Sequence, residues 1–108
     1  MSPGSDTASL PGFSASLSGD APPEGLRPAL EALWRAAKGD WDGAHRLVQD
    51  DSSREAAWVH AYLHRVEGDL GNARYWYGRA DRSPASGPLE AEWDEIAGAL
   101  LARQSGRR

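Results

Sequence analysis

The stretch that decides the fold is GDWDGA at residues 39–44, which returns 29 positions later as GDLGNA at residues 68–73. In both copies a glycine and an aspartate stand first and an alanine stands last. Glycine adopts the left-handed backbone that ends a helix, and aspartate caps the free N–H groups at the start of the next one. The repeat therefore predicts two places where one helix stops, another begins at once and the chain doubles back.

Residues with helical spacing lie on both sides of the first break. Pro28 suits the first turn of a helix because its missing N–H would be unpaired there, and Gly39 ends the apolar pattern that follows. A second helix is expected from Trp41 to about residue 49. Helices joined by so short a connection lie side by side in opposite directions.

The stretch around the second break predicts another such pair. The sequence EAAWVHAYLHRVE (residues 55–67) is apolar nearly all round, which is typical of a helix buried between neighbours. Ser52 and Glu55 have the capping-box spacing at its start. After the second glycine–aspartate pair, a fourth helix is expected over residues 70–80.

A fifth helix is predicted after Pro88, where apolar residues form a continuous stripe. Acidic residues gather at its start and Arg103 stands near its end, which complements the helix dipole. The expected fold is all-α: two tandem antiparallel helix hairpins followed by a C-terminal amphipathic capping helix.

Composition divides the chain into a domain and two tails. Residues 1–25 are rich in Ser, Gly, Pro and Ala, so we expect a disordered tail that cannot bury enough surface to offset its ordering entropy. Residues 26–104 form a single helical domain, and residues 105–108 form a second disordered tail. Three apolar residues in the first tail have helical spacing, which we interpret as incidental: Leu10, Phe13 and Leu17.

Composition also excludes several functions. The net charge is −4 and no basic stripe is present, so we expect neither nucleic acid nor an anionic membrane surface as a partner. Cysteine is absent, which excludes disulfides and thiolate chemistry. The first twenty residues lack the features of a secretory signal, so a cytoplasmic location is expected. The five tryptophans are interpreted mainly as core residues.

The glycine, alanine and aromatic positions of the second hairpin resemble the tetratricopeptide repeat (TPR) family. The matching residues are Gly68, Ala73, Tyr77 and Ala80, and the first hairpin matches through Gly39 and Ala44. The resemblance covers about residues 28–84, with a repeat step shorter than the family's usual length of about 34. It implies stacked helical hairpins and a concave surface that binds a protein or peptide segment.

If the resemblance holds, seven residues of the middle hairpin form the partner-binding surface: Glu55, Trp58, Tyr62, Arg65, Asn72, Tyr75 and Arg79. Arginine binds carboxylates through two parallel hydrogen bonds, and aromatic rings supply flat apolar contact. The alternative is that Trp58 and Tyr62 complete the core.

The histidines suggest a different chemistry. His60 and His64 are four residues apart, so their rings project from one face of a helix, and His45 could approach them if the hairpins pack as expected. Imidazole nitrogens in this arrangement can share a metal ion. The commoner explanation of such histidines is packing, with each ring bonded to a carbonyl or an acidic neighbour.

Two main hypotheses follow. The first is a small adaptor or assembly subunit without cofactors, which binds a protein partner, including a second copy of itself. The alternative is a small metal-binding protein or histidine-based enzyme centred on the three histidines. No catalytic motif is present, so no catalytic residue is assigned and an enzyme is the less favoured hypothesis. A purely structural, oligomer-forming subunit is the third possibility.

Overall fold

Short helices account for nearly all of the regular structure. The computed structural model describes residues 9–105, and this range contains helices but no strand. The helices are α1 (Leu10–Ala15), the 3-10 turn η2 (Ser16–Ser18), α2 (Pro28–Ala37), α3 (Trp41–Val48), α4 (Arg54–Val66), α5 (Leu70–Ala80) and α6 (Leu89–Ser105). The all-α prediction is therefore confirmed.

The two glycine–aspartate breaks lie where the sequence places them. Gly39 and Gly68 have φ angles of 84° and 86°, in the left-handed region that favours glycine. Asp40 and Asp69 each accept a hydrogen bond on the side chain from the backbone N–H three residues further on. These caps start α3 and α5 immediately after the preceding helix has ended.

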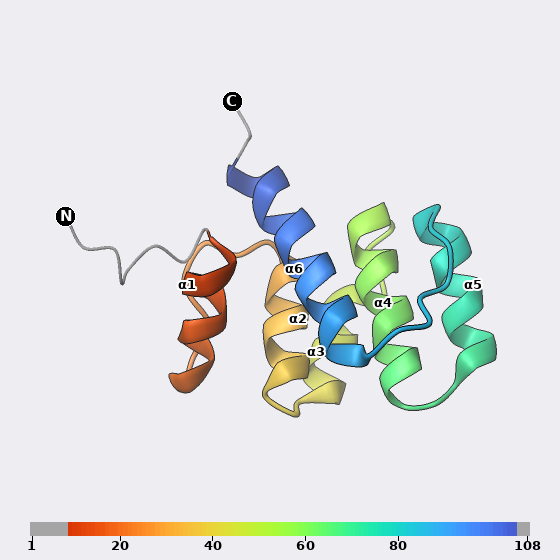
Figure 1. Cartoon of the computed structure of the whole chain (residues 1–108), viewed down its shortest axis with the longest axis horizontal. Coiled ribbons are helices and arrows are strands. Elements are labelled where there is room, and N and C mark those ends of the chain that lie inside the picture. The colour runs from red at the N-terminus through yellow and green to blue at the C-terminus, as the bar shows by residue number, and fades with distance from the viewer. Residues whose placement is uncertain (1–8, 106–108) are drawn as a thin grey trace.

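The helices pack in the order in which the chain makes them. α2 packs against α3, α4 packs against α5, and α4 also contacts α2 and α3. The ribbon descends through α4 and returns through α5, while α6 crosses in front of the α2–α3 pair (Figure 1). α6 contacts α1, α2 and α4, so it joins the N-terminal segment to both helix pairs.

The start of α4 differs by one residue from the predicted cap. Ser53, not Ser52, is the N-cap, and its hydroxyl accepts a hydrogen bond from the N–H of Ala56. The side chain of Asp51 accepts from the N–H of Ser53 and fixes the turn before it. Glu55 is thereby left free to pair with Arg103 of α6.

The core lies between α2, α4 and α6. Its fully buried aliphatic residues include Leu33, Val59, Leu63 and Ile96. The indole N–H of Trp93 donates to the carbonyl of Leu33 at 2.8 Å, which joins α6 to α2. Three of the five tryptophans are buried, as the core interpretation predicts: Trp34, Trp58 and Trp93.

The N-terminal segment differs from the disordered tail expected over residues 1–25, because its described part is helical from residue 10. Phe13 of α1 is completely buried and stacks on Trp93 with 5.6 Å between ring centroids. Ser16 accepts a hydrogen bond from the indole N–H of Trp34. Leu10 and Leu17 are partly buried and pack against the core as well, so the interpretation of the three apolar residues as incidental is wrong. Residues 1–8 and 106–108, which hold the rest of both expected tails, lie outside the described range.

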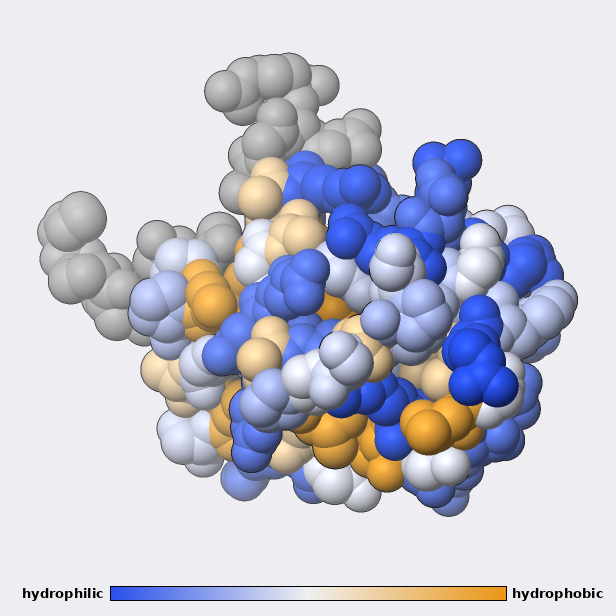
Figure 2. Space-filling model, turned by 45° about the vertical axis from the view of Figure 1, so that its right-hand side comes forward, coloured by the Kyte–Doolittle hydropathy of each residue, from blue (hydrophilic) through white to orange (hydrophobic). Residues whose placement is uncertain are grey.

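The surface is mostly polar. Figure 2 shows a largely hydrophilic face with separate orange areas. Among the described residues, the large hydrophobic side chains most exposed to solvent are Val66, Leu70 and Tyr75. None of the helices in residues 9–105 combines the length and the apolar composition that a membrane span needs.

Candidate metal centre

The three histidines of the chain converge at the contact between α3 and α4. His45 comes from α3, and His60 and His64 come from successive turns of α4. The Nε2 atoms of His45 and His60 are 3.0 Å apart. Each of the three rings offers one nitrogen that lies within 4.8 Å of the other two. The packing of α3 against α4, across the connection at residues 49–53, brings His45 to the two histidines of α4.

The cluster is shielded from water on most sides. His60 is 3% exposed and His64 is 7% exposed, whereas His45 is partly exposed at the edge. Two tryptophans enclose the rings: Trp41 stacks on His45 with centroids 4.8 Å apart, and Trp76 stacks on His60 at 3.9 Å. These stacked contacts restrict the rotation of the imidazoles.

Glu67 fixes the orientation of His64. Its Oε1 atom lies 2.6 Å from Nδ1 of His64. An ionised carboxylate only accepts hydrogen bonds, so Nδ1 carries a proton, and in the neutral ring Nε2 is the nitrogen with the free lone pair. Histidine ligands of metal ions are commonly held by a carboxylate in this manner.

His45 and His60 make a contact that a single proton can bridge. When both rings are neutral, one Nε2 carries a proton and donates it to the other, and a metal ion in place of that proton would bind both lone pairs. The other nitrogen of His60, Nδ1, is buried and has no hydrogen-bond partner among residues 9–105. Packing therefore accounts for His64, which has an acidic neighbour. It leaves the Nδ1 atom of His60 without a hydrogen bond to any described residue.

The environment favours the neutral forms of His45 and His60. Burial, followed by the neighbouring His45 and His64, lowers the pKa of His60 to about 4. Burial is also the main cause that lowers the pKa of His45, with His64 acting in the same direction and Glu67 and Asp42 opposing it. Neutral imidazole is the form that binds metal ions.

A second group of possible ligands shares His64 with this cluster: His64, Glu67 and Asp69. Its carboxylates are exposed and already have structural partners. Glu67 accepts from His64, and Asp69 caps α5. Capping and orientation explain this second group without a metal ion.

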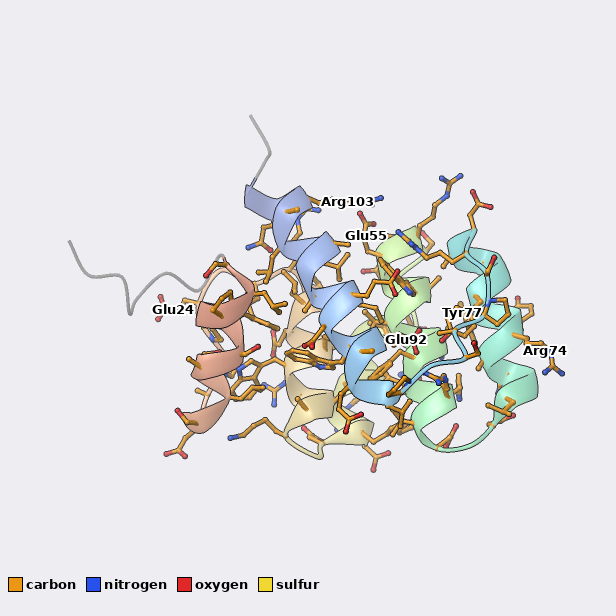
Figure 3. The ribbon with its side chains drawn as sticks, viewed as in Figure 1. Glu24, Glu55, Arg74, Tyr77, Glu92 and Arg103 are labelled. Atoms are coloured by element: carbon orange, nitrogen blue, oxygen red, sulfur yellow. The ribbon has the colours of Figure 1, made fainter. Side chains whose placement is uncertain are left out.

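The predicted partner-binding residues of α4 face the rest of the chain. Trp58 is 5% exposed and Tyr62 is 7% exposed. Glu55 pairs with Arg103, and Arg65 pairs with the buried Glu92 of α6. Figure 3 shows Glu55 and Arg103 together at one end of the helices and Glu92 between α6 and α4.

The predicted partner-binding residues of α5 lie apart from those of α4 and are exposed. Arg79 donates a hydrogen bond to the hydroxyl of Tyr75 at 3.0 Å. The amide of Asn72 donates to Asp69. The structure therefore divides the predicted surface into an inward set on α4 and an outward set on α5.

Sequence reasoning did not identify the residues around the histidines. Trp41 precedes His45 by four positions and Glu67 follows His64 by three, so helical spacing is a signal that could have found both. Trp76 comes from α5 and has no such local signal.

Comparison of the chain with models of protein families, with curated proteins and with solved structures finds no match.

Proposed function

We propose that the protein binds a transition-metal ion through ring nitrogens of His45, His60 and His64, with zinc as the first candidate. The observation that supports this most directly is the convergence of one nitrogen from each ring within 4.8 Å. Zinc–nitrogen bonds of about 2.05 Å place two ligands on a tetrahedral ion about 3.3 Å apart. The 3.0 Å between Nε2 of His45 and Nε2 of His60 is close to that value.

The type of ligand limits the choice of metal. Imidazole suits zinc, copper, nickel and iron, whereas calcium and magnesium prefer oxygen ligands. Three protein ligands also leave a fourth position, which an outside ligand can occupy. The proposal is therefore a three-histidine site for a first-row metal, stabilised by Trp41, Trp76 and Glu67.

Metal analysis of the folded protein tests the proposal. Protein purified without a polyhistidine tag is loaded with zinc, dialysed and assayed by mass spectrometry, and its affinity is measured by competition with a chromophoric chelator. We expect one zinc ion per chain in the wild type. His45→Ala changes a partly exposed residue at the edge of the core, so it removes a ligand with little disturbance of the fold and abolishes stoichiometric binding.

Two further variants sharpen this test. Arg46→Ala alters the exposed neighbour of His45 on the same helix and leaves binding unchanged, which makes it the matched control. Glu67→Gln keeps all three ligands but removes the carboxylate that orients His64, so affinity falls by about 10- to 100-fold. A helical His45→Ala protein that retains wild-type zinc affinity would contradict the proposal, and so would a folded wild type that binds no metal.

Self-association through α5 is a second candidate, which follows the partner-binding hypothesis. Its support is the exposure of Leu70 and Tyr75, each 55% exposed. Aromatic and aliphatic residues on an exposed helix are common anchors of protein interfaces. Analytical ultracentrifugation tests it: the wild type forms a dimer that Tyr75→Ser and Leu70→Ser dissociate, whereas a wild type that is monomeric at high concentration contradicts it.

A further inference from the structure

A cavity of about 450 Å³ lies on the side of α4 opposite the histidines, between the N-terminal segment and α6. Its lining includes three apolar and three polar residues: Leu17, Leu89, Trp93, Tyr62, Glu90 and Asp94. Tyr62 is two positions from both His60 and His64, and residues two apart on a helix face different ways. The cavity is therefore separate from the proposed metal centre.

The apolar part of the cavity depends on the docking of α1. Trp93 is 7% exposed, and Phe13 of α1 stacks on its ring. The indole N–H of Trp93 is already bonded to the carbonyl of Leu33, so the tryptophan offers an apolar surface to the cavity and not a donor. Leu17 of η2 and Leu89 of α6 extend this surface.

Tyr62 places an unused polar atom in the cavity. Its side chain is more than nine-tenths buried, and its hydroxyl has no hydrogen bond to any described residue. The hydroxyl is not among the buried polar atoms without a partner, so it reaches solvent through the cavity. A ligand in the cavity would bond to it in place of water.

Two carboxylates stand at the mouth of the cavity. Glu90 and Asp94 are four residues apart on α6, so they project from the same face. Among the described residues neither carboxylate has an ion-pair partner, in contrast with Glu55 and Glu92, which pair with arginines. Like charges at this spacing repel each other, and a bound cation would relieve the repulsion.

The charge of Glu90 also reaches the hydroxyl of Tyr62. Burial raises the pKa of Tyr62 to about 12, the carboxylates of Glu92 and Glu90 act in the same direction, and Arg65 opposes them. The hydroxyl therefore keeps its proton at physiological pH.

We infer that this cavity binds a small organic cation, a primary ammonium group on a short apolar body. The apolar body fits against Leu17, Leu89 and Trp93. The ammonium group donates hydrogen bonds to the carboxylates of Glu90 and Asp94 and to the oxygen of Tyr62, because it has three donors and no acceptor. The volume lies in the range of ligand pockets, about 300–1,000 Å³.

Hexylammonium chloride is a suitable probe, with hexanol and sodium hexanoate as neutral and anionic controls of the same length. Each is titrated into the full chain, treated with chelator so that no metal is bound, and binding is followed by calorimetry and by the NMR signal of the Trp93 indole N–H. We expect saturable binding of hexylammonium that shifts this signal. Hexanol binds roughly tenfold more weakly because it lacks the charge, and hexanoate does not bind.

Variants assign the contacts. The double variant Glu90→Gln/Asp94→Asn removes both charges and weakens hexylammonium binding roughly tenfold. Tyr62→Phe keeps the ring and weakens it about threefold. Glu95→Gln neutralises an exposed acid of the same helix outside the cavity lining, and it leaves the affinity unchanged.

Three results would overturn the inference. They are the absence of hexylammonium binding, equal affinity for hexylammonium and hexanol, and equal loss of affinity in Glu95→Gln and in the double variant. None of them bears on zinc binding by the histidines, which is measured separately.

Discussion

His60 lies between two kinds of neighbour, an aromatic ring that fills space and an imidazole that shares a proton. Trp76 stacks on one face of its ring, and His45 meets its Nε2 atom. The opposite nitrogen, Nδ1, has no hydrogen-bond partner in the described part of the chain. Protonation of His60 in these surroundings destabilises the folded chain. The stability of the metal-free protein should therefore depend on pH.

We predict that the metal-free protein loses stability as the pH falls from about 6.5 toward 4. The pKa of His60 is about 4 in the folded chain and 6.5 as the reference value, so the unfolded chain binds its proton first as the pH falls. The contribution of His60 to the free energy of unfolding is fully present above pH 6.5, and it is lost as the pH falls from 6.5 to about 4. At 1.36 kcal/mol per pKa unit, the full loss is on the order of 3 kcal/mol.

Urea unfolding of chelator-treated protein at several pH values measures this dependence. His60→Gln lacks the titrating ring, so its unfolding free energy should change much less over the same window. If the wild type and the variant show the same pH dependence, another group causes the loss and His60 is not held neutral by its surroundings.

At the scale of the elements, α1 shows how one residue can decide whether a segment docks. Five of its six residues are small or only partly buried, and Phe13 alone is completely buried. Its composition predicts disorder, since composition averages over the segment and gives little weight to a single ring. The receiving surface around Trp93 belongs to α6, about 80 residues away along the chain, and no local pattern reveals it.

Phe13→Ala should therefore detach α1 and expose Trp93. We expect the free energy of unfolding to fall by about 3 kcal/mol, the lower end of the range for removing a buried phenylalanine ring. Chemical denaturation measures the loss, and amide hydrogen exchange over residues 10–18 shows whether the segment has been released. Asp20→Ala, at an exposed position after the same segment, serves as the control. Equal stability of Phe13→Ala and the control would mean that α1 contributes nothing.

The boundaries of the other helices were more predictable because they depend on neighbouring residues. A glycine with positive φ and an aspartate cap act within one turn, so the sequence alone places the breaks at residues 39–40 and 68–69. The start of α4 was predicted one residue early. Ser52 and Ser53 are equally good caps by type, and the hydrogen bond from the N–H of Ser53 to Asp51 distinguishes them only in three dimensions.

At the scale of the whole molecule, contacts between elements limit what can be predicted. The pairing of His60 and His64 follows from their spacing on one helix, whereas the approach of His45 depends on how α3 packs against α4. The link from α6 to Arg65 of α4 and Tyr77 of α5 is made by Glu92, which in the sequence is one of several acidic residues at a helix start. Its burial is visible only in the folded chain.

Glu92 is the residue through which α6 holds both α4 and α5. It is 4% exposed, accepts a hydrogen bond from Arg65 of α4 at 2.8 Å and accepts another from the hydroxyl of Tyr77 of α5 (Figure 3). Burial and the hydrogen bond to Glu92 raise the pKa of Tyr77, so the tyrosine remains a donor. The three side chains form one network between three helices, in which Glu92 and Tyr77 are buried and Arg65 is partly buried.

Arg65→Met tests whether this network holds the molecule together. Removing the arginine leaves the carboxylate of Glu92 buried without its cation, which costs about 3–5 kcal/mol of unfolding free energy. The double variant Arg65→Met/Glu92→Gln removes the uncompensated charge and should recover part of that loss, because an amide costs less to bury than a carboxylate. Arg103→Met breaks the exposed pair with Glu55 and should cost less than about 1 kcal/mol. Equal losses from Arg65→Met and Arg103→Met, measured by chemical denaturation, would show that burial of the first pair contributes nothing, and α6 would then be held by its apolar face alone.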